Sequence, residues 1–362
     1  MKKNNKKILI ATGGTGGHIF PSITLADFLN REYEVEITTD RRGSKYLKDF
    51  NDIRINIINS NPIFGKKILG IFIGLINIIF STLYSAIFIL KSKPALVIGM
   101  GGYSSFPVCL AAYFFRVPII VYENNLIIGR ANRFLLPMVK KILVSTKDTK
   151  GIDSKYQNKI FFLGYLLRNK IFNLKQNDLQ IEKDNLSILV IGGSQSAKIF
   201  SQALPSVMTK CCKNNVKFKI YQQCLEKDKD QISRTYKKLN LDFKLFSFSD
   251  SLFEYYQKAD LAITRSGASS IAELLNLRIP FIAIPLPTSA DNHQFENASY
   301  FEKKGYCFLL EERFIHDKLF QMLIDLNENR KKLFLLKRNM IKHSDKDAVL
   351  KANEIIKKVL DV

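Results

Sequence analysis

The sequence is poor in the residues that build metal centres and disulfide frameworks. Its 362 residues include only five cysteines and four histidines, and no tryptophan. The cysteines are odd in number and form no C-x-x-C pair, so neither a disulfide framework nor a zinc site is expected, and a reducing cytoplasm is the natural compartment. We therefore expect a protein that works without a metal or another bound cofactor. The cysteines are Cys109, Cys211, Cys212, Cys224 and Cys307.

Acidic residues are also scarce. Asp and Glu together number 33 against 55 Lys and Arg, which gives a formal net charge of +22. A field of this sign attracts nucleic acid, anionic lipid headgroups or phosphorylated substrates, although a lysine excess can also serve solubility alone. The basic residues form no zinc-finger, RNP or basic-zipper pattern. Nucleic acid is therefore not an expected partner, and a nucleic-acid binder stays open only on composition.

The N-terminus lacks the long apolar run of a secretory signal. After a lysine-rich start, the apolar stretch Ile8–Ala11 is short and meets Gly13-Gly14 almost at once. This pattern predicts a buried first strand rather than a signal peptide.

Strands, glycine loops and helices alternate through the first half of the chain. The glycine-rich stretch Gly13–His18 follows the first strand, and a helix is predicted from about Pro21 to Asn30. A second glycine run, Gly99–Tyr103, follows another apolar strand. This alternation is typical of a doubly wound α/β domain. The strands predicted here are Ile8–Ala11, Val35–Thr38, Ala95–Gly99, Pro118–Tyr122 and Lys141–Ser145.

The same pattern restarts after a polar stretch at Asn173–Asn185. The strands predicted in the second half are Leu186–Ile191, Phe218–Gln222, Leu261–Thr264 and Phe281–Ile284. We expect an α/β protein with two Rossmann-like domains, at residues 1–163 and 164–345. A C-terminal helix in 346–362 is expected to pack back toward the N-terminal domain.

The segment Ile68–Leu90 has no charged residue and is bracketed by lysines, so its length would allow it to span a bilayer. Its small and polar residues recur at helical spacing, and bulky apolar residues cover the other faces. The small stripe comprises Gly70, Gly74, Asn77, Ser81 and Ser85, and the bulky set Phe72, Ile76, Ile79, Phe80, Leu83, Ile87 and Leu90. We favour a helix lying on the membrane surface. A buried crossover helix and a true span remain alternatives.

The loop Gly13–His18 suits a phosphate or nucleotide, because glycines let backbone N–H groups approach an anion at a helix N-terminus. It matches neither the dinucleotide fingerprint nor a Walker A motif, and Asp40 is the only candidate ribose acid. His18 ends the loop, where the helix dipole disfavours imidazolium and leaves a neutral ring able to accept a proton. A purely structural histidine is the alternative.

The second half contains three comparable features. Gly192–Gln195 repeats the strand-to-glycine arrangement, and Arg265–Glu273 joins the strand Leu261–Thr264 to a helix. Glu273 could compensate the helix dipole or accept hydrogen bonds from ribose hydroxyls. The amide-rich stretch Asp291–Ala298 suits sugar hydroxyls, or forms a polar turn and cap.

In order and spacing these motifs resemble the MurG family of UDP-N-acetylglucosamine:N-acetylmuramyl-(pentapeptide) pyrophosphoryl-undecaprenol N-acetylglucosaminyltransferases, from about Ile8 to Ala298. The motifs that carry the resemblance are Gly13–His18 with Phe20-Pro21, Gly99–Tyr103, Glu123-Asn124-Asn125, Gly192–Gln195, Arg265–Ala268 with Glu273, and His293-Gln294 with Asn297-Ala298. The resemblance implies the GT-B architecture, in which two Rossmann-like domains face each other across a cleft.

The resemblance also implies site residues. The first loop would contact the donor or the acceptor diphosphate, Asn125 the donor sugar, Ser194 the donor phosphates, Glu273 the ribose and Gln294 sugar hydroxyls. The implied substrate-binding set is Thr15, Gly16, Gly17, Asn125, Arg168, Ser194, Ser249, Ala268, Ser269, Ser270, Ile271, Ala272, Glu273, His293 and Gln294.

Some positions depart from the family pattern. Arg168 closes Gly164-Tyr165-Leu166-Leu167-Arg168, where the family has G-N-P-V-R. Ser196 stands where glycine is usual, and Leu126 where the family has a small residue. Ser249 occupies a position that the family uses through its backbone, toward the uracil.

The implied reaction is an inverting transfer of N-acetylglucosamine to the C4 hydroxyl of undecaprenyl-linked lipid I, with His18 as the first candidate base and Glu123 as the second. The departing UDP would be stabilised by helix N-termini and loop amides without a metal. A peripheral position on the cytoplasmic side of the bacterial inner membrane, with cell-wall synthesis proteins as possible partners, fits the basic charge. Transfer to another lipid, such as a diacylglycerol, and a non-enzymatic membrane scaffold stay open as alternatives.

Overall fold

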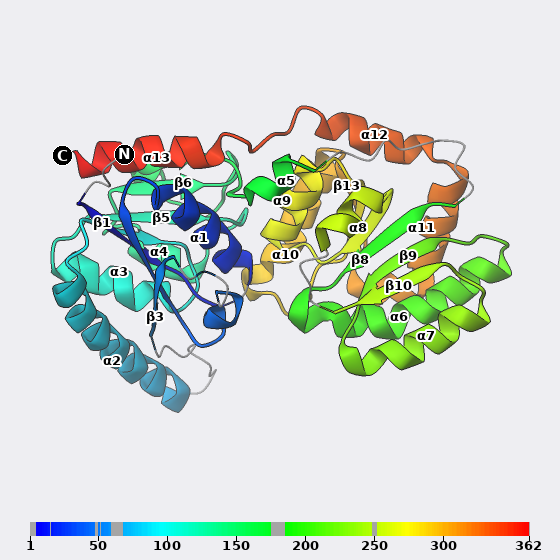
Figure 1. The fold of residues 1–362 in the computed structure, drawn as a ribbon, viewed down its shortest axis with the longest axis horizontal. Coiled ribbons are helices and arrows are strands. Elements are labelled where there is room, and N and C mark those ends of the chain that lie inside the picture. The colour runs from blue at the N-terminus through cyan, green and yellow to red at the C-terminus, as the bar shows by residue number, and fades with distance from the viewer. Residues whose placement is uncertain are drawn as a thin grey trace. The chain divides into compact units, whose positions relative to one another are not determined.

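The computed structural model describes residues 5–14, 16–47, 50, 52–58, 68–174, 185–247 and 252–361, with the side chains of 68–73 and 193–197 left aside. The chain divides into two compact units, residues 1–168 with 345–362, and residues 169–344. Both units consist of a parallel sheet with helices, so the α/β fold class of two Rossmann-like domains is confirmed (Figure 1).

Within the described residues, the sheet of the first unit has the strand order β3-β2-β1-β4-β5-β6-β7, and all of its pairings are parallel. The strands are β1 (Lys7–Ala11), β2 (Glu34–Thr39), β3 (Arg54–Ile57), β4 (Leu96–Gly99), β5 (Ile119–Glu123), β6 (Lys141–Val144) and β7 (Ile160–Phe162). The helices are α1 (Gly16–Leu29), α2 (Ile68–Ser92), α3 (Ser105–Phe114), α4 (Arg130–Leu135) and α13 (Ala348–Leu360). The strand order reverses direction beside β1, which is where α/β sheets bind ligands.

Strand β1 shows why this sheet needs cover on both faces. Ile8 and Ile10 enter one hydrophobic core with α1 and α13, whereas Leu9 and Ala11 enter a second core with α3. Successive strand side chains point to opposite faces, so a strand that is apolar at every position must be buried on both sides. The C-terminal helix α13 therefore completes the core of the first unit (Figure 1).

The second unit repeats this plan, with the order β10-β9-β8-β11-β12-β13 in its described residues, again entirely parallel. The strands are β8 (Ser187–Ile191), β9 (Lys219–Gln223), β10 (Phe243–Phe246), β11 (Leu261–Thr264), β12 (Phe281–Ala283) and β13 (Cys307–Leu309). The helices are α5 (Asn169–Phe172), α6 (Gly193–Lys213), α7 (Lys229–Lys238), α8 (Leu252–Lys258), α9 (Ala268–Asn276), α10 (His293–Lys303), α11 (Ile315–Glu328) and α12 (Lys331–Met340).

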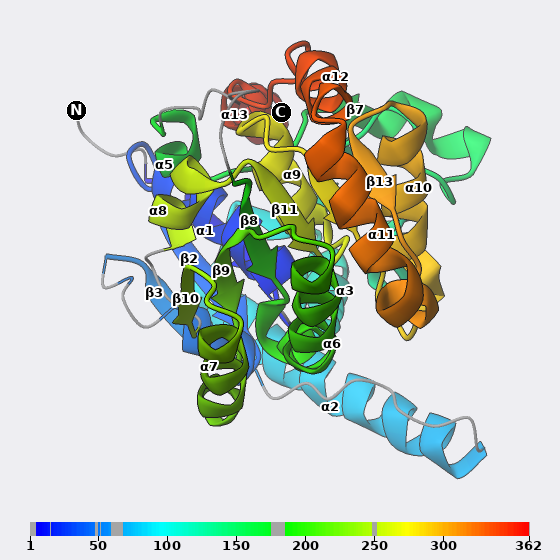
Figure 2. The ribbon, with the colours of Figure 1, turned by 90° about the vertical axis from the view of Figure 1, so that its right-hand side faces the viewer.

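Helix α2 connects β3 to β4 and packs against α3. The small stripe was correctly assigned to the protein side, since Gly74, Ser81 and Ser85 are buried. The alternative of a wholly buried crossover helix is wrong, because the bulky apolar side chains are about half exposed or more. Figure 2 shows one end of this helix projecting beyond the ribbon around it. The exposed set, named the α2 face below, is Leu75, Ile76, Ile79, Phe80, Leu83, Tyr84, Ile87 and Leu90.

The part of α2 from Gly74 to Ser92 has a mean hydropathy of 1.7 with 22% of it buried, so its length and composition would allow it to cross a membrane. Gly70 of the predicted small stripe and Phe72 of the predicted bulky set lie in the part of α2 for which burial is not described.

Candidate active site

The first glycine loop follows β1 and is held by a buried carboxylate. Asp40 accepts hydrogen bonds from the N–H groups of Gly14 (3.2 Å) and Gly43 (2.8 Å), and it pairs with Arg42 at 2.7 Å. Gly14 has a φ of +89°, a conformation that glycine adopts without steric cost. Asp40 is therefore engaged in shaping this loop, which leaves it unsuited to the ribose contact of a dinucleotide-binding fold.

The two glycine loops of the first unit lie in direct contact. A Cβ placed on Gly13 would be 1.6 Å from Oγ of Ser104, and one on Gly102 would be 2.5 Å from the carbonyl oxygen of Gly13. Gly102 also has a φ of +82°. Ser104 fastens the contact by donating a 2.9 Å hydrogen bond to the carbonyl of Thr12. Glycine is needed at Gly102 because the backbone of Gly13 approaches too closely for a side chain, and at Gly13 because the side chain of Ser104 takes the space.

His18 lies in the first turn of α1, beside the second loop. A Cβ on Gly101 would be 2.8 Å from Cε1 and 2.9 Å from Nδ1 of His18. Gly101, with a φ of +88°, thus gives the imidazole a flat backbone surface to lie against. The ring position is set by two segments that meet at the carboxyl ends of β1 and β4.

Helix α1 begins at Gly16 rather than near Pro21, where its start was predicted. Proline is favoured in the first turn of a helix because it lacks an N–H, so a start near Pro21 agrees with the local preference. In the structure Pro21 lies inside the helix, so the carbonyl of Gly17 receives no N–H from it. Asn124 supplies the missing donor, with Nδ2 3.1 Å from that carbonyl oxygen. The polar turn after β5 thereby fixes the start of α1.

Glu123 ends β5 and is 1% exposed. One carboxylate oxygen accepts hydrogen bonds from the backbone N–H (3.0 Å) and side-chain amide (3.1 Å) of Asn125. The other accepts from the N–H of Gly129 (2.8 Å) and Nδ2 of Asn132 (2.9 Å). Both oxygens are thus engaged in shaping the turn that presents Asn125, an arrangement that suits a positioning residue better than a base.

Arg168 lies at the end of the first unit with its guanidinium 4.8 Å from the ring centroid of Phe20. The same ring lies close to Gly16, where a Cβ would be 2.8 Å from it. Phe20 therefore connects Arg168 to the first turn of α1, which contains Gly16, Gly17 and His18.

The approach to Arg168 is fixed by a buried tyrosine. The hydroxyl of Tyr122 donates to Oδ1 of Asn124 (3.0 Å) or to the carbonyl of Gly164 (3.3 Å), and it accepts from the N–H of Leu166 (3.2 Å). Burial raises the pKa of Tyr122 well above its ordinary value, so the hydroxyl keeps its proton. From the sequence, Tyr122 received no role and Asn124 only a place in the Glu123-Asn124-Asn125 motif. The missing N–H of Pro21 was a signal for a donor such as Asn124.

In the second unit, helix α9 begins at Ala268, directly after β11 and its buried Arg265-Ser266 pair. Arg265 donates to the carbonyls of Ile284 (3.2 Å) and Pro285 (3.0 Å) and forms an ion pair with Glu312. The guanidinium of Arg265 thereby connects the ends of the neighbouring strands β11 and β12. The amides of the first turn of α9 stand at the carboxyl edge of the sheet, where an anion is stabilised. Ser269 and Ser270 lie half-buried in that turn.

Glu273 lies one turn further along α9 and is 7% exposed. One of its carboxylate oxygens accepts a 2.6 Å hydrogen bond from the hydroxyl of Tyr256, which is itself buried on α8. Tyr256 thereby orients the carboxylate at the helix start. The neighbouring residues Ile271 and Ala272 are fully buried, so their side chains serve packing rather than contact with a ligand.

The loop before α10 has an unusual backbone. Asp291 and Asn292 have φ values of +50° and +53°, a left-handed conformation that is uncommon for residues other than glycine. Oε1 of Gln294 accepts from the N–H of Leu286 at 3.0 Å, whereas its NH₂ group donates to no described residue. His293 has Nδ1 2.7 Å from the carbonyl of Ala290. The loop thus holds the amide of Gln294 with its donors available for a hydroxyl.

Some predicted site residues cannot be placed. Thr15 and Ser249 lie outside the described residues, as does the side chain of Ser194, although α6 does begin at Gly193 as the second glycine loop suggested. In the part of the chain that the structure describes, no cluster of three or more His, Cys, Asp or Glu residues is arranged to hold a metal.

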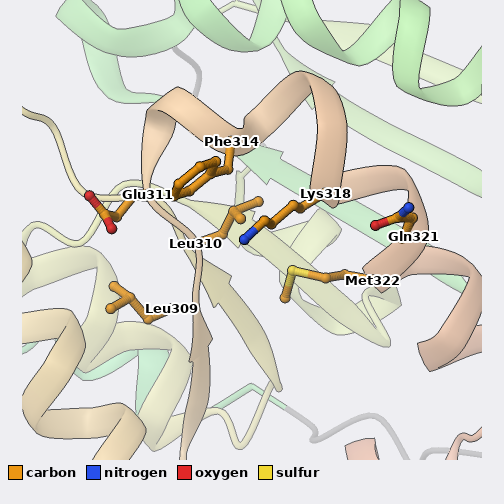
Figure 3. A pocket seen from close by; sticks show the side chains of 7 residues that line it. All are labelled: Leu309, Leu310, Glu311, Phe314, Lys318, Gln321 and Met322. Carbon is orange, nitrogen blue, oxygen red and sulfur yellow. The ribbon is translucent and has the colours of Figure 1, made fainter.

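A pocket of about 340 Å³ lies beside β13 and α11, and its lining includes none of the predicted site residues (Figure 3). Apolar side chains of Leu309, Leu310, Phe314 and Met322 and the charged Glu311 and Lys318 surround it. Nothing in this lining repeats the glycine loops and helix starts described above.

Comparison with known proteins assigns these features to a family. Residues 8–144 match the glycosyltransferase family 28 N-terminal domain, and residues 187–352 match the C-terminal domain of the same family. The chain belongs to glycosyltransferase family 28. The enzyme class expected from the sequence, a hexosyltransferase, is thereby confirmed.

Two curated relatives of this family 28 chain carry the same name, UDP-N-acetylglucosamine--N-acetylmuramyl-(pentapeptide) pyrophosphoryl-undecaprenol N-acetylglucosamine transferase. The protein of Pelagibacter ubique is 38% identical over 93% of both chains, and that of Rickettsia felis is 35% identical over 98% of this chain and 100% of the relative.

Among solved structures, Acinetobacter baumannii MurG aligns with a TM-score of 0.80 at 23% identity, covering 98% of this chain and 100% of that one. The S. aureus MnaA–UDP co-structure aligns with a TM-score of 0.70 at 16% identity, covering 98% and 97%. At these identities the two structures support the shared fold alone.

Proposed function

We propose that this glycosyltransferase moves N-acetylglucosamine from UDP-N-acetylglucosamine to the C4 hydroxyl of undecaprenyl-diphospho-N-acetylmuramoyl-pentapeptide, the lipid I to lipid II step of peptidoglycan synthesis. The observation that carries the proposal is the 35–38% sequence identity with curated transferases of that name, which extends over nearly the full length of the chain. Transfer to another membrane lipid has no comparable support.

The proposed chemistry is a single inverting displacement. An imidazole nitrogen of His18 takes the proton from the acceptor hydroxyl, and the hydroxyl oxygen bonds to the anomeric carbon. The bond between that carbon and the diphosphate oxygen breaks, and UDP leaves with its electrons. The fixed position of His18 against Gly101 supports its role as the base, whereas the four hydrogen bonds to Glu123 support a positioning role for that carboxylate.

The donor half of the proposal rests on the second unit. The amides at the start of α9 stabilise the diphosphate, and the Glu273 carboxylate, oriented by Tyr256, accepts from the ribose hydroxyls. Gln294 donates to sugar hydroxyls through the amide group that its loop holds in place. Ser194, Ser249 and Thr15 keep the substrate roles that the family resemblance implies.

The acceptor half rests on the first unit. A lipid-linked acceptor must be met at a membrane, and the α2 face supplies an exposed apolar surface for peripheral attachment. A cytoplasmic orientation follows in this proposal from the use of a nucleotide sugar. We place the enzyme on the cytoplasmic side of the inner membrane, and cell-wall synthesis proteins remain candidate partners.

The decisive experiment incubates the purified chain with radiolabelled UDP-N-acetylglucosamine and a lipid I analogue in detergent, and follows label in the lipid product. Diacylglycerol serves as the competing acceptor in a parallel reaction. Transfer to the lipid I analogue alone is the expected result. Transfer to diacylglycerol instead would show that the proposed acceptor is wrong. Binding of the donor without transfer to either lipid would favour a non-enzymatic scaffold.

A further inference from the structure

Helix α12 in the second unit has a charge pattern that the proposed reaction does not use. It contains lysines and an arginine but no acidic residue, and Lys342 lies two residues after its end at Met340. Leu333, Leu336 and Met340 are 0%, 5% and 0% exposed. The side of the helix that carries them therefore faces the interior of the second unit. Figure 1 shows α12 between α11 and the chain segment that leads to α13.

The opposite side of α12 is both cationic and apolar. Helical geometry places Lys331, Leu335 and Arg338 away from the buried residues, and all three are exposed. The side chains of Leu335 and Ile341 are 57% and 54% exposed. We name the set Lys331, Leu335, Arg338, Ile341 and Lys342 the α12 surface.

The cations of the α12 surface are not neutralised by the protein. Lys332 is excluded from the set because it pairs with Asp325 at 2.6 Å. By contrast, Lys331, Arg338 and Lys342 form no ion pair with any residue that the structure describes. The positive charge at this place is therefore available to a partner of opposite sign.

We propose that the α12 surface is a second membrane contact, which binds an anionic lipid bilayer through the second unit, in addition to the α2 face of the first. The long stems of Lys331 and Lys342 let their ammonium groups reach lipid phosphates while Leu335 and Ile341 enter the interface between headgroups and acyl chains. An exposed leucine and isoleucine among the cations match a bilayer better than a nucleic acid, whose backbone offers phosphates but no apolar layer. The inference rests on the proposed membrane-bound function and adds a contact made by the donor-binding unit.

The test compares variants of the full chain for binding to vesicles of phosphatidylglycerol and phosphatidylcholine. The first variant is Lys331→Glu with Arg338→Glu and Lys342→Glu. Its matched control is Arg234→Glu with Lys237→Glu and Lys238→Glu, which reverses three exposed charges on α7 of the same unit. Both are measured with and without Ile76→Ser, Ile79→Ser and Leu83→Ser, so that strong binding by the α2 face cannot mask the difference.

We expect the α12 charge reversal to weaken binding to phosphatidylglycerol vesicles by about tenfold or more, because each cation near an anionic surface contributes separately. The α7 control should change binding by less than about twofold, since Debye screening limits the effect of distant charge. Leu335→Ser with Ile341→Ser should weaken binding even in high salt, where the charges are screened. Unchanged melting temperatures would show that all variants are folded.

Equal losses in the α12 and α7 variants would reduce the effect to net charge and overturn the proposal. Unchanged vesicle binding, with loss of binding to a duplex DNA or RNA probe, would overturn it in favour of a nucleic-acid surface. Transfer to a detergent-solubilised lipid I analogue is measured in parallel and should be normal in every α12 variant. If the wild type transfers nothing there, the proposed function fails while the vesicle comparison still decides the role of α12.

Discussion

The imidazole of His18 lies against the backbone of Gly101, so closely that a Cβ at Gly101 would be 2.8 Å from Cε1 of the ring. The contact joins the start of α1 to the loop after β4, because the imidazole ring packs directly against the backbone of Gly101. The absence of a side chain at Gly101 therefore allows the proposed base to occupy this position.

The first prediction concerns this pair. Because a general base contributes about 10²- to 10⁴-fold to turnover, His18→Ala should lower kcat by that amount and leave UDP affinity nearly unchanged. Gly101→Ala should displace the same ring and also lower kcat, since the added Cβ would lie only 2.8 Å from Cε1 of the imidazole. Steady-state kinetics measures the loss of turnover, and calorimetric titration with UDP measures whether nucleotide affinity is kept. Normal turnover in His18→Ala would make His18 structural.

The sequence was informative where a strand is buried on both faces of its sheet. The strand Leu261–Thr264 was predicted with its observed bounds, and the start of β1 was predicted one residue too late. Such strands are recognisable because a strand that is buried on both faces consists mostly of apolar residues. The start of α1 was wrong, because a contact between residues 107 positions apart, Asn124 to Gly17, replaces the hydrogen bond that Pro21 cannot make.

The candidate site shows the same division. Local patterns identified the glycine loops, His18 and the start of α9 as features of the first turn after a strand. The partners that fix them come from distant segments, as when Arg265 binds Glu312, 47 positions away. No local pattern reports such pairs, so the roles of Tyr122, Tyr256 and Glu312 became visible only in three dimensions.

The second prediction separates a base from a positioning residue at Glu123. Removing its carboxylate releases the donors of Asn125, Gly129 and Asn132, so Glu123→Ala should lower both kcat and thermal stability. The ionisation that limits kcat at low pH should persist in this variant, because it belongs to His18. A pH–rate profile of residual activity decides the matter, with His18→Ala as the comparison. Loss of the low-pH limb in Glu123→Ala alone would make Glu123 the base.

The third prediction concerns the ribose contact. Glu273→Ala should weaken UDP-sugar binding by about 1–3 kcal/mol, the range for a lost buried hydrogen bond to a charged group. Tyr256→Phe removes only the 2.6 Å hydrogen bond that orients the carboxylate, so its effect should be smaller and in the same direction. Calorimetric titration of both variants with UDP measures the difference. Unchanged affinity in Glu273→Ala would reject the ribose role.

The fourth prediction concerns metal removal. Helix N-termini and loop amides take the place of a cation at the leaving diphosphate in the proposed reaction, so transfer should survive excess EDTA. The measurement is the initial rate before and after chelation, followed by addition of Mg²⁺ or Mn²⁺. Abolition by EDTA and recovery with either ion would show that the donor phosphates bind a metal.

The last prediction concerns the α2 face. Ile76, Ile79 and Leu83 are 50%, 58% and 56% exposed, so replacing all three by serine should leave the fold and UDP binding intact. The same change should release the enzyme from anionic vesicles, because the apolar area that enters the interface is lost. Salt should weaken wild-type attachment only in part, since apolar burial persists when charges are screened.

The control for α2 replaces buried Ser85 by leucine, which should destabilise the protein, because this position faces the unit and is 0% exposed. Vesicle flotation and thermal melting distinguish surface attachment from the alternatives. Unfolding of the triple serine variant would mean that these side chains pack against the protein in solution. A wild type that resists carbonate extraction, with Lys66 and Lys91 labelled from opposite sides of the vesicle, would establish a true span, because a surface helix keeps both of its ends on one side.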